Sequence, residues 1–306
     1  MALTQAQGLG LSNPWLRSGF YEDIPQVIQL AHRLWFDVVP GDRKRDAIAP
    51  VLAPAGGVGY GPPPTPLTQS VPSNREYSFG VLADSFTVNY ATQDAQSNVN
   101  DQTAMQFGMA VRRLLYGFWR MFIEGDTVNP GEFQGLRSII SQPAFAGQII
   151  DKGGTPLATQ DLSSAMRRVK SSDNFSLISY TSAEGYNAVE EAFISRSVLP
   201  TPKPMLIPDG FGGFHVDYRS SVFGADLLWS DFVPIVPGPP ALSEIWFINL
   251  GAVHGICPPL ANGQMIRTRA TPLGTIEPAT RFDLTYPVAI NVPRVTDIAL
   301  IRNFAV

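Results

Sequence analysis

Charge is scarce in this sequence of 306 residues. Aspartate, glutamate, lysine and arginine make up 16% of it, against about 25% in an average globular protein. Lysine is the scarcest of the four, with only Lys44, Lys152, Lys170 and Lys203. The formal net charge is -4, so the chain lacks the overall basic character that marks many nucleic-acid-binding proteins.

Cysteine, histidine and long apolar runs are also rare. Cys257 is the single cysteine, which excludes an intramolecular disulfide and a zinc cluster built from cysteines. The three histidines are far apart in the sequence and lack the spacing of metal ligands. The first ten residues lack the cationic and apolar segments of a secretory signal. The longest apolar run, Ile245–Cys257, is shorter than the roughly 20 residues that span a bilayer. We therefore expect a protein made in the cytosol, with no membrane partner.

Glycine and proline, in contrast, are abundant, with 27 of each. Many of them lie in residues 50–72 and 199–240, which are both predicted to be irregular because proline cannot donate a backbone hydrogen bond. Residues 50–72 are expected to form a long projecting loop. Such a loop is unusual inside a compact domain, but it is reasonable where a neighbouring subunit covers it. The low charge favours the same interpretation, in which neighbours cover part of the surface.

Segments on both sides of this loop show local patterns. Asp42–Leu52 and Glu76–Tyr90 are predicted to form a pair of strands, and the alternation of apolar residues in the second strand changes parity, which predicts a bulge or bend near Asp84. Residues 1–24 are expected to form an extended arm whose aromatic side chains pack on something else, such as a neighbouring chain. A short helix is predicted over Ile24–Trp35.

The strongest helical pattern follows at Asn98–Glu124, which contains no proline. Apolar residues recur there at intervals of three and four, at Phe107, Val111, Leu114, Leu115, Phe118 and Phe122. Asn98 or Asn100 can cap the start of the helix and Gly125 its end. The helix would be about 40 Å long, against roughly 50 Å for the diameter of a compact chain of this length. We call it the spine helix.

Shorter elements complete the predicted fold. Helices are expected over Gln160–Lys170 and over Ser182–Ser195, the second capped by Ser182. Strands are expected at Phe175–Tyr180, Glu244–Leu250, Gln264–Arg269, Arg281–Val292 and Thr296–Phe304. Helices and antiparallel strands are segregated, so the predicted class is α+β.

Few residues form a pattern that indicates chemistry. The glycine run at 56–61 is followed by prolines rather than by a helix, which disfavours a phosphate-binding loop. His254 and Cys257 are close enough in sequence to suggest a nucleophile and its base, but a buried cysteine near a strand end, with the histidine bonded to the backbone, is the favoured interpretation. No esterase-type serine motif is present.

Adjacent like charges occur at three places on the predicted helices. Glu190 with Glu191 is interpreted as a solvated face, because neighbouring helical residues point about 100° apart. Arg112–Arg113 and Arg167–Arg168 are interpreted in the same way, with contact to packaged nucleic acid or to an acidic neighbour as the alternative. The sequence therefore predicts no catalytic, cofactor-binding or metal-binding residue.

The order of the predicted elements and two local stretches support a resemblance. Asp94–Gln102 enters the spine helix, and Phe122–Asp126 leaves it, followed by Pro130–Leu136 with the sequence PGEFQGL. This resembles the tailed-phage major capsid proteins of the Hong Kong 97 type, whose fold encapsulin nanocompartments share. Residues 86–140 carry the close resemblance. Asn174–Val198 is similar to the axial strand and helix of that family, and residues 281–306 to its closing strands.

The resemblance implies a Hong Kong 97-like α+β fold with five segments. Residues 1–41 would be an N-terminal arm and short helix, and residues 42–90 an extended β-hairpin loop. Residues 91–155 would form a peripheral domain with the spine helix at 98–124, and residues 156–264 an axial domain. Residues 265–306 would return as strands of both domains.

The function implied by the resemblance is structural rather than enzymatic. Copies of the chain would form hexamers and pentamers of an icosahedral viral head around double-stranded DNA, assembled in the host cytoplasm. Partners would be the chain itself, separate scaffold, portal and decoration proteins, and DNA through weak non-specific contacts. Crosslinking of the loop is not inferred, because Lys44, near its base, is the only lysine there.

Two alternatives remain for the function. One is an encapsulin-like shell, although Pro14 and several glycines in the arm disfavour the N-terminal helix with which encapsulins usually bind cargo peptides. The other is a soluble enzyme with an unrecognised site.

Overall fold

The computed structural model describes Leu30 and residues 33–40, 43–48, 73–89, 102–170, 176–196, 201–208, 214–259, 265–273 and 279–306. The helices in these ranges are α4 (Gln102–Glu124), α5 (Leu136–Ile140), α6 (Thr159–Arg168) and α7 (Ala183–Ile194), with the 3-10 turns η1 (Pro143–Gln148) and η3 (Val295–Asp297). The strands are β1 (Phe36–Val38), β2 (Arg43–Ile48), β3 (Ser73–Ser78), β4 (Gly80–Asn89), β5 (Ile149–Asp151), β6 (Leu177–Thr181), β7 (Thr201–Pro208), β8 (Phe214–Val222), β9 (Ala225–Trp229), β10 (Leu242–Asn249), β11 (His254–Cys257), β12 (Arg267–Pro272), β13 (Ala279–Asn291) and β14 (Ile298–Ala305).

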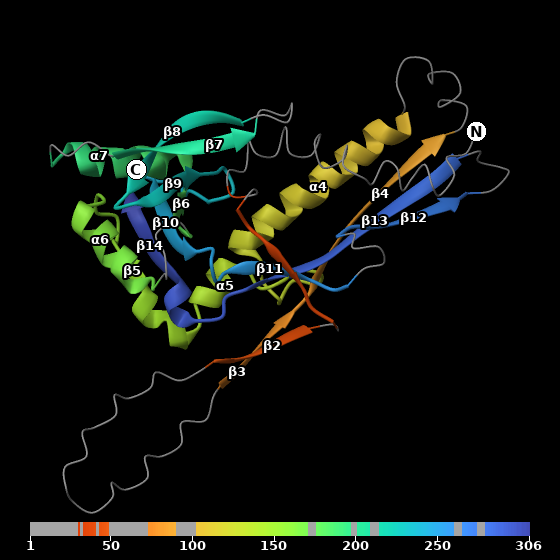
Figure 1. Ribbon diagram of the computed structural model, residues 1–306, viewed down its shortest axis with the longest axis horizontal. Helices are drawn as coiled ribbons and strands as arrows, with labels where there is room; N and C mark the ends of the chain where they lie inside the picture. Colours follow the sequence, from red (N-terminus) through yellow and green to blue (C-terminus); the bar gives the residue numbers. More distant parts are fainter. Residues whose placement is uncertain are drawn as a thin grey trace, which may run out of the picture.

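A seven-stranded mixed sheet forms the centre of one lobe (Figure 1). Its strand order is β5-β14-β10-β6-β9-β8-β7, with β10 antiparallel to both of its neighbours and β6 parallel to β9. β6 and β10 are buried along almost their whole length, as expected for strands covered on both faces. One face packs with α6 and α7 through residues such as Leu162, Val189 and Phe247. The other face, with Tyr180 and Trp246, belongs to a core shared with α4 and α5.

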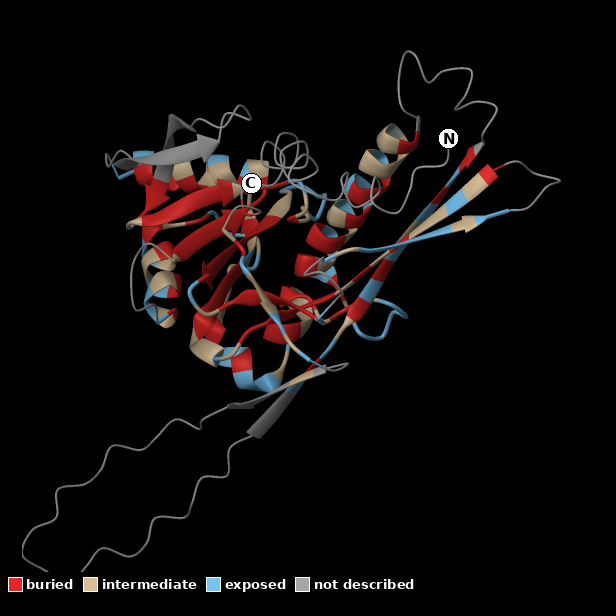
Figure 2. Cartoon of the chain, turned by 45° about the vertical axis from the view of Figure 1, so that its right-hand side comes forward, coloured by how far each residue is buried: buried red, intermediate tan, exposed pale blue. Residues whose placement is uncertain are grey.

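The second sheet is built around the long strand β13. Its first ten residues pair antiparallel with β4, and on the other side β13 pairs with β12 and then with β11. β1 continues this sheet parallel to β11. Alternate residues of β4, at Leu82, Phe86 and Val88, are buried on the side of α4, and the Phe86 ring meets Phe107 of that helix edge-on. Figure 2 shows the ribbon of β4, β13 and β12 reaching beyond the body, with exposed residues along it.

A separate hairpin, β2–β3, projects from the body on the side away from β7 and β8 (Figure 1). Its register runs from Arg43 opposite Ser78 to Ile48 opposite Ser73. Only part of the expected second arm belongs to it, because β4 leaves the hairpin to pair with β13. The residues of the predicted N-terminal arm, residues 1–24, and of the predicted loop tip, residues 50–72 with their glycine run, lie outside the described residues.

The expected break near Asp84 was wrong. β4 runs without interruption through Asp84 and keeps a continuous register with β13. The break lies at Phe79, between β3 and β4. Before it the buried side chain is at an odd-numbered position, Tyr77, and after it the buried side chains are at even-numbered positions, beginning with Leu82. The sequence pattern suggested the wrong position because Asp84, although polar, lies on the inward side, where Arg113 of α4 pairs with it.

The prediction that residues 199–240 are irregular was also wrong, because β7, β8 and β9 lie in this segment. β7 holds Pro202, Pro204 and Pro208, yet it is the edge strand of its sheet. An edge strand has one side on which no ladder bond is needed, so prolines are tolerated there. β8 pairs with β9 only at Ser221 and Val222, so most of the β7–β8 ribbon extends past the sheet.

Most other sequence expectations hold within the described residues. The spine helix is α4, which ends at Glu124 as predicted, and residues 98–101 before it are outside the described part. The helices at 160–170 and 182–195 are α6 and α7, and the Ser182 hydroxyl accepts the N–H of Gly185 as a helix cap. Of the helix expected at 24–35, the described part shows one turn, in which the N–H of Leu34 donates to the carbonyl of Leu30. Trp35 then leads into β1.

Candidate functional site

The residues that could suggest catalysis are held in structural roles. Cys257 ends β11 and is buried, and its thiol donates to the backbone carbonyl of Asp37 at 3.8 Å. Burial raises the pKa of the Cys257 thiol, and the negative charge of Asp37 adds to this rise. A protonated thiol is a poor nucleophile. His254 holds the carbonyl of Ala252 at 2.7 Å through Nδ1 and stacks on Trp35, which matches the structural interpretation of both residues.

The adjacent like charges do not converge on a site. Glu191 is exposed on α7, and Arg112 is exposed on α4. Arg113 Nε donates to Asp84 at 2.7 Å, and Arg168 donates to the carbonyls of Gly147 and Ile149. Within the described ranges, no group of three or more His, Cys, Asp and Glu side chains could hold a metal ion. No helix in the described part is long and apolar enough to cross a membrane.

Two joints connect the elements of the described structure. A first joint, which we call the glycine joint, brings the end of α4, the start of β4 and the segment before α5 into backbone contact. The N–H of Gly135 donates to the carbonyl of Gly125 at 2.8 Å. A Cβ atom on Gly125 would lie 2.6 Å from the carbonyl oxygen of Met121, and one on Gly80 would lie 2.6 Å from the nitrogen of Phe133. Both contacts are closer than a side chain allows, so glycine is required at each position.

Phe133 and Glu132 close this joint from two sides. The Phe133 ring is fully buried and packs 5.6 Å from the ring of Phe118 on α4. The Glu132 carboxylate accepts the N–H of Asp126 and the side-chain amide of Asn129. These two hydrogen bonds, the one from Asn129 first, hold the pKa of Glu132 below its ordinary value. Residues 125–126 (GD) and 130–136 (PGEFQGL) therefore have a structural role. They form the close turn that leads from the end of α4, past the start of β4, into α5.

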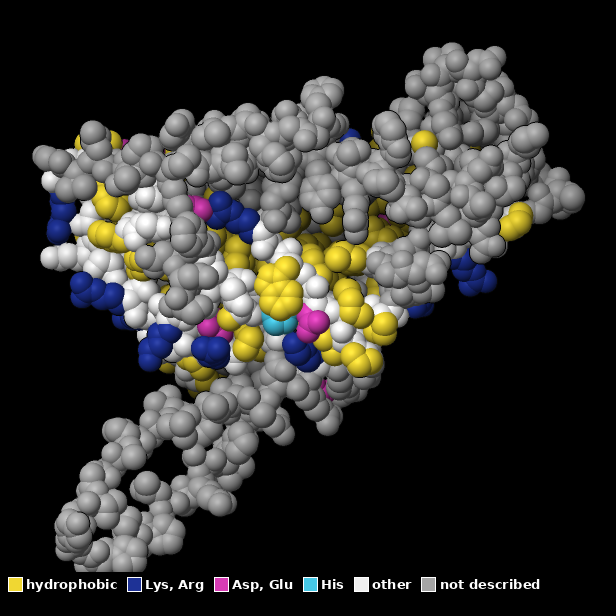
Figure 3. Space-filling model, in the orientation of Figure 1, with side chains coloured by type: hydrophobic (Ala, Val, Ile, Leu, Met, Phe, Trp, Pro, Cys, Tyr) yellow, Lys and Arg dark blue, Asp and Glu magenta, His cyan; other side chains and the backbone are white. Residues whose placement is uncertain are grey.

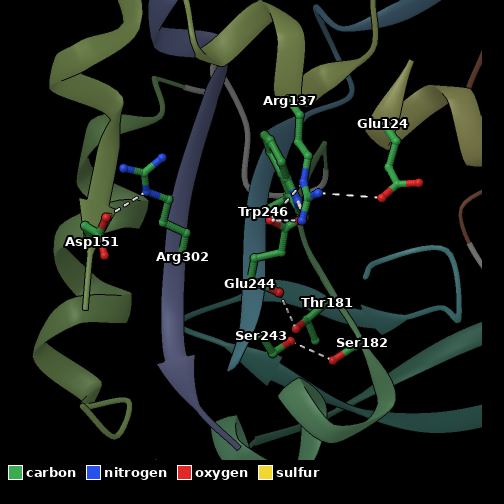
Figure 4. A network of polar contacts seen from close by, with 9 residues as sticks. All are labelled: Glu124, Arg137, Asp151, Thr181, Ser182, Ser243, Glu244, Trp246 and Arg302. Atoms are coloured by element: carbon green, nitrogen blue, oxygen red, sulfur yellow. Dashed lines mark hydrogen bonds and ion pairs between the residues drawn. The ribbon is translucent and has the colours of Figure 1, made fainter. Parts of the chain in front are cut away.

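A second joint, the Glu244 joint, connects α4 and α5 to the seven-stranded sheet (Figure 4). Glu244 of β10 is buried, and its carboxylate accepts Arg137 Nη2 at 2.9 Å and the indole N–H of Trp246 at 2.8 Å. Arg137 of α5 also reaches Glu124, the last residue of α4, at 3.5 Å. One arginine thus ties the end of α4 to the centre of the sheet.

Hydroxyl groups fix the start of β10 as well. Thr181 Oγ1 donates to the carbonyl of Glu244 at 2.7 Å, and the hydroxyls of Ser182 and Ser243 are 2.7 Å apart. The cap of α7 is therefore bonded directly to β10 (Figure 4). The Glu244 joint was not among the sequence predictions. One signal for it is present, because a lone carboxylate in an otherwise apolar strand requires a buried partner.

The N-terminal described segment is held by the body at three points. β1 pairs with β11, the indole N–H of Trp35 donates to the carbonyl of Leu250, and Arg33 forms an ion pair with the buried Asp226 of β9. Among the described contacts, Tyr77 and Lys44 attach the β2–β3 hairpin to the body. The Tyr77 hydroxyl donates to the carbonyl of Val292 at 2.6 Å, and Lys44 lies 3.5 Å from the carboxylate of Asp37.

Large apolar side chains remain exposed on several elements. They include Trp35, Val38, Val81, Met109, Tyr116, Ile194 and Phe223. Phe223 is 47% exposed with a φ of 50°, a backbone conformation that is costly for a bulky residue. Figure 3 shows hydrophobic side chains above a histidine in the middle of the face, with acidic and basic side chains beside it.

Comparison with known proteins gives no match by sequence and clear matches by structure. No family model matches the chain, and no curated protein matches it. The holo-SrpI encapsulin complex from Synechococcus elongatus is similar with a TM-score of 0.64 and 16% identity, over 90% of this chain and 87% of that chain. The capsid of a native GTA particle is similar with a TM-score of 0.60 and 15% identity, over 90% of each chain. The capsid of cyanophage A-1(L) is similar with a TM-score of 0.59 and 15% identity, over 90% of this chain and 92% of that chain.

Each of these matches covers 90% of this chain. They confirm the predicted α+β class and the predicted resemblance. The chain therefore has the Hong Kong 97-type capsid fold, the fold that phage capsids and encapsulin shells share.

Proposed function

We propose that this chain is a structural subunit that assembles with copies of itself into a closed protein shell, and that it has no enzymatic role. The observation that carries this proposal is the extent of the structural match. About nine tenths of this chain and of each shell subunit correspond to each other, so the correspondence is between whole subunits rather than between isolated domains.

The surface of the subunit supports the same proposal. A shell places many identical interfaces around each subunit, and each interface needs apolar groups that neighbours can cover. Exposed apolar side chains lie on β1, β4, α4 and α7, so they are spread over several elements of the subunit. Low total charge suits such a subunit, because fewer charged groups must be desolvated when neighbours close on it.

For the contents of the shell, we propose double-stranded DNA inside an icosahedral viral head built from hexamers and pentamers. The assembled virion would then be the location of the chain, after assembly in the host cytoplasm. Separate scaffold, portal and decoration proteins are the further partners proposed. The runner-up is an encapsulin-like compartment for protein cargo, which the similarity to the holo-SrpI encapsulin favours.

Sedimentation velocity of the purified chain, followed by electron microscopy, tests the shell. We expect capsomers or closed particles, formed alone or with a scaffold. A monodisperse monomer at high concentration under all salt conditions would contradict the proposal. Nuclease treatment of intact particles, followed by extraction, then separates the two kinds of content. Protected double-stranded DNA supports the viral head, and co-purifying protein cargo supports the compartment.

The five segments inferred from the resemblance also stay proposals, with residues 42–90 reaching over a neighbouring subunit and residues 156–264 forming the axial domain. Deletion of residues 53–66 tests the projecting loop. We expect a folded subunit, with the circular dichroism spectrum and unfolding midpoint of the full chain, that fails to form particles. An unfolded subunit would contradict the assignment.

A further inference from the structure

The attachment of the β2–β3 hairpin contains a histidine in direct contact with a lysine. Lys44 of β2 reaches the body, and its ammonium lies 3.4 Å from Nε2 of His254 on β11. His254 is 6% exposed, and the side chain of Lys44 is 19% exposed. Water therefore screens this contact only in part. The protonation state of His254 then decides whether Lys44 meets a hydrogen-bond acceptor or a second positive charge.

The described partners of the ring suit a neutral imidazole. Nδ1 lies 2.7 Å from the carbonyl oxygen of Ala252, which can only accept, so Nδ1 carries a proton. Nε2 faces two donors, the Lys44 ammonium and the side-chain amide nitrogen of Asn291 at 3.3 Å. An unprotonated Nε2 accepts from these donors, whereas a protonated Nε2 cannot accept from either.

The side chain of Asn291 can accept a hydrogen bond from the protonated ring. Its side chain is 1% exposed, and its Oδ1 is buried without a hydrogen-bond partner in the described structure. Rotation of the amide by 180° exchanges Oδ1 and Nδ2, so that Oδ1 accepts the new proton on Nε2. The stacked ring of Trp35, 4.1 Å from the imidazole, also favours a cation on its face. The protonated ring therefore has suitable partners in Asn291 and Trp35. The interaction that becomes unfavourable is the one between the ring and the Lys44 ammonium.

The described contacts place Asp37 of β1 beside this histidine–lysine pair. Its carboxylate lies 3.5 Å from the Lys44 ammonium and holds the ammonium near the ring. On the hairpin, Arg45 and Glu76 face each other in the register next to Lys44. Cys257, on the same strand as the histidine, stays protonated because burial raises the pKa of its thiol. Protonation of the ring adds a positive charge directly against the Lys44 ammonium.

We propose that His254 is a proton-operated latch for the β2–β3 hairpin. The neutral ring holds Lys44 and keeps the hairpin docked, and the protonated ring repels Lys44 and releases it. Because the released state binds the extra proton more readily, acidification shifts the equilibrium toward release. The latch acts within one chain, so the inference does not depend on the proposed shell.

Hydrogen–deuterium exchange of the full-length chain tests the latch. Exchange of the amides of β2 and β3 is compared at pH 8 and pH 5 after correction for the intrinsic rate at each pH. We expect the corrected exchange of these amides to be about ten-fold faster at pH 5, the ratio that corresponds to one pKa unit of coupling. Amides of β10 serve as the internal reference and confirm in every variant that the body is folded. Sedimentation at both pH values restricts the comparison to samples in the same oligomeric state.

Two variants give the proposal its sharpest form. With His254→Gln the ring proton is lost, and we expect equal corrected exchange at both pH values. With Lys44→Glu we expect the corrected exchange of β2 and β3 to be slower at pH 5 than at pH 8. The new carboxylate is attracted by the protonated ring at pH 5 and repelled by Asp37 at pH 8. His215→Gln is the matched control, since it removes a histidine elsewhere and leaves the wild-type response. Equal exchange at both pH values in the wild type, or an unchanged response in His254→Gln, would overturn the proposal.

Discussion

The Glu244 joint and the hairpin attachment hold two parts of the same chain in very different ways. At the Glu244 joint, a buried carboxylate accepts from Arg137 and Trp246 within an apolar core that spans α4, α5 and the seven-stranded sheet. At the hairpin, the described attachment rests on the Tyr77 hydroxyl and on the half-buried Lys44. The first joint holds a charged group in the core, whereas the second consists of one buried hydroxyl and one partly exposed ammonium in its described contacts. We expect the second to open more readily than the first.

The difference is useful for a subunit that must fit against many copies of itself. A buried ion pair tolerates little change of geometry, because breaking it strands a charge in the core. A few polar contacts at the base of a ribbon can instead be exchanged for contacts with another chain. We therefore expect the body to be one rigid unit and the hairpin to adapt.

Arg137→Met should give the largest effect, because it strands the Glu244 carboxylate with the Trp246 indole as its remaining described side-chain partner. Glu244 is the buried partner and Arg137 is 38% exposed, so we expect a loss of about 3.5 kcal/mol in the free energy of unfolding, in the lower half of the range for buried pairs. Urea denaturation measures it. The matched control is Arg302→Met, which removes an exposed pair with Asp151 and should cost about 0.5 kcal/mol. Similar losses for the two variants would show that the Glu244 joint contributes no more to stability than an exposed ion pair.

Gly125→Ala tests the glycine joint. The added Cβ would lie 2.6 Å from the carbonyl oxygen of Met121, and backbone atoms cannot move away as a flexible side chain could. We expect a loss of about 3 kcal/mol in unfolding free energy. Gly108→Ala on the same helix meets no atom within 4 Å and should stabilise the chain by up to about 1 kcal/mol. A stabilising Gly125→Ala would refute the backbone contact.

Tyr77→Phe tests the weaker attachment. The hydroxyl donates to the carbonyl of Val292 and accepts its N–H, and both bonds are buried. Their loss should cost about 1.5 kcal/mol. We expect the effect as faster hydrogen exchange in β2 and β3, with little change in β10. Tyr116→Phe, at an exposed site on α4, should change neither. A uniform increase in exchange across the body would contradict a separately opening hairpin.

The pH dependence of Glu132 should be the smallest effect. Hydrogen bonds from Asn129 and the Asp126 backbone lower its pKa. The carboxylate therefore stabilises the fold above its unfolded pKa, and this contribution is lost as pH falls through the lowered value. Thermal unfolding between pH 6 and pH 3 should show a steeper loss for the wild type than for Glu132→Gln. Parallel curves would show that the two hydrogen bonds contribute nothing.

The sequence was sufficient where the deciding interactions are local. The spacing of apolar residues identified α4, and Ser182 identified the start of α7, because a helix face and a cap depend on residues three or four apart. The role of His254 and Cys257 was also interpreted correctly from residue type. The GD and PGEFQGL stretch was recognised by resemblance, but its backbone contacts with β4 emerge only in three dimensions.

Other features depend on partners far along the chain. Glu244 and Arg137 are separated by 107 residues, and no local pattern pairs them. β7 was missed because its prolines are acceptable only when the strand lies at a sheet edge, which its own sequence does not reveal. The position of the break at Phe79 depended on the pairing of β4 with β13.

Electron cryomicroscopy of the assembled particle is the most direct test of the account. Independent copies of the subunit would be superimposed on the seven-stranded sheet. The account predicts a closed shell in which α4 and the Glu244 joint keep one geometry in every copy, while the β2–β3 hairpin differs in its angle to the body between copies. Absence of closed particles, or a hairpin that stays fixed while the Glu244 joint bends, would contradict it.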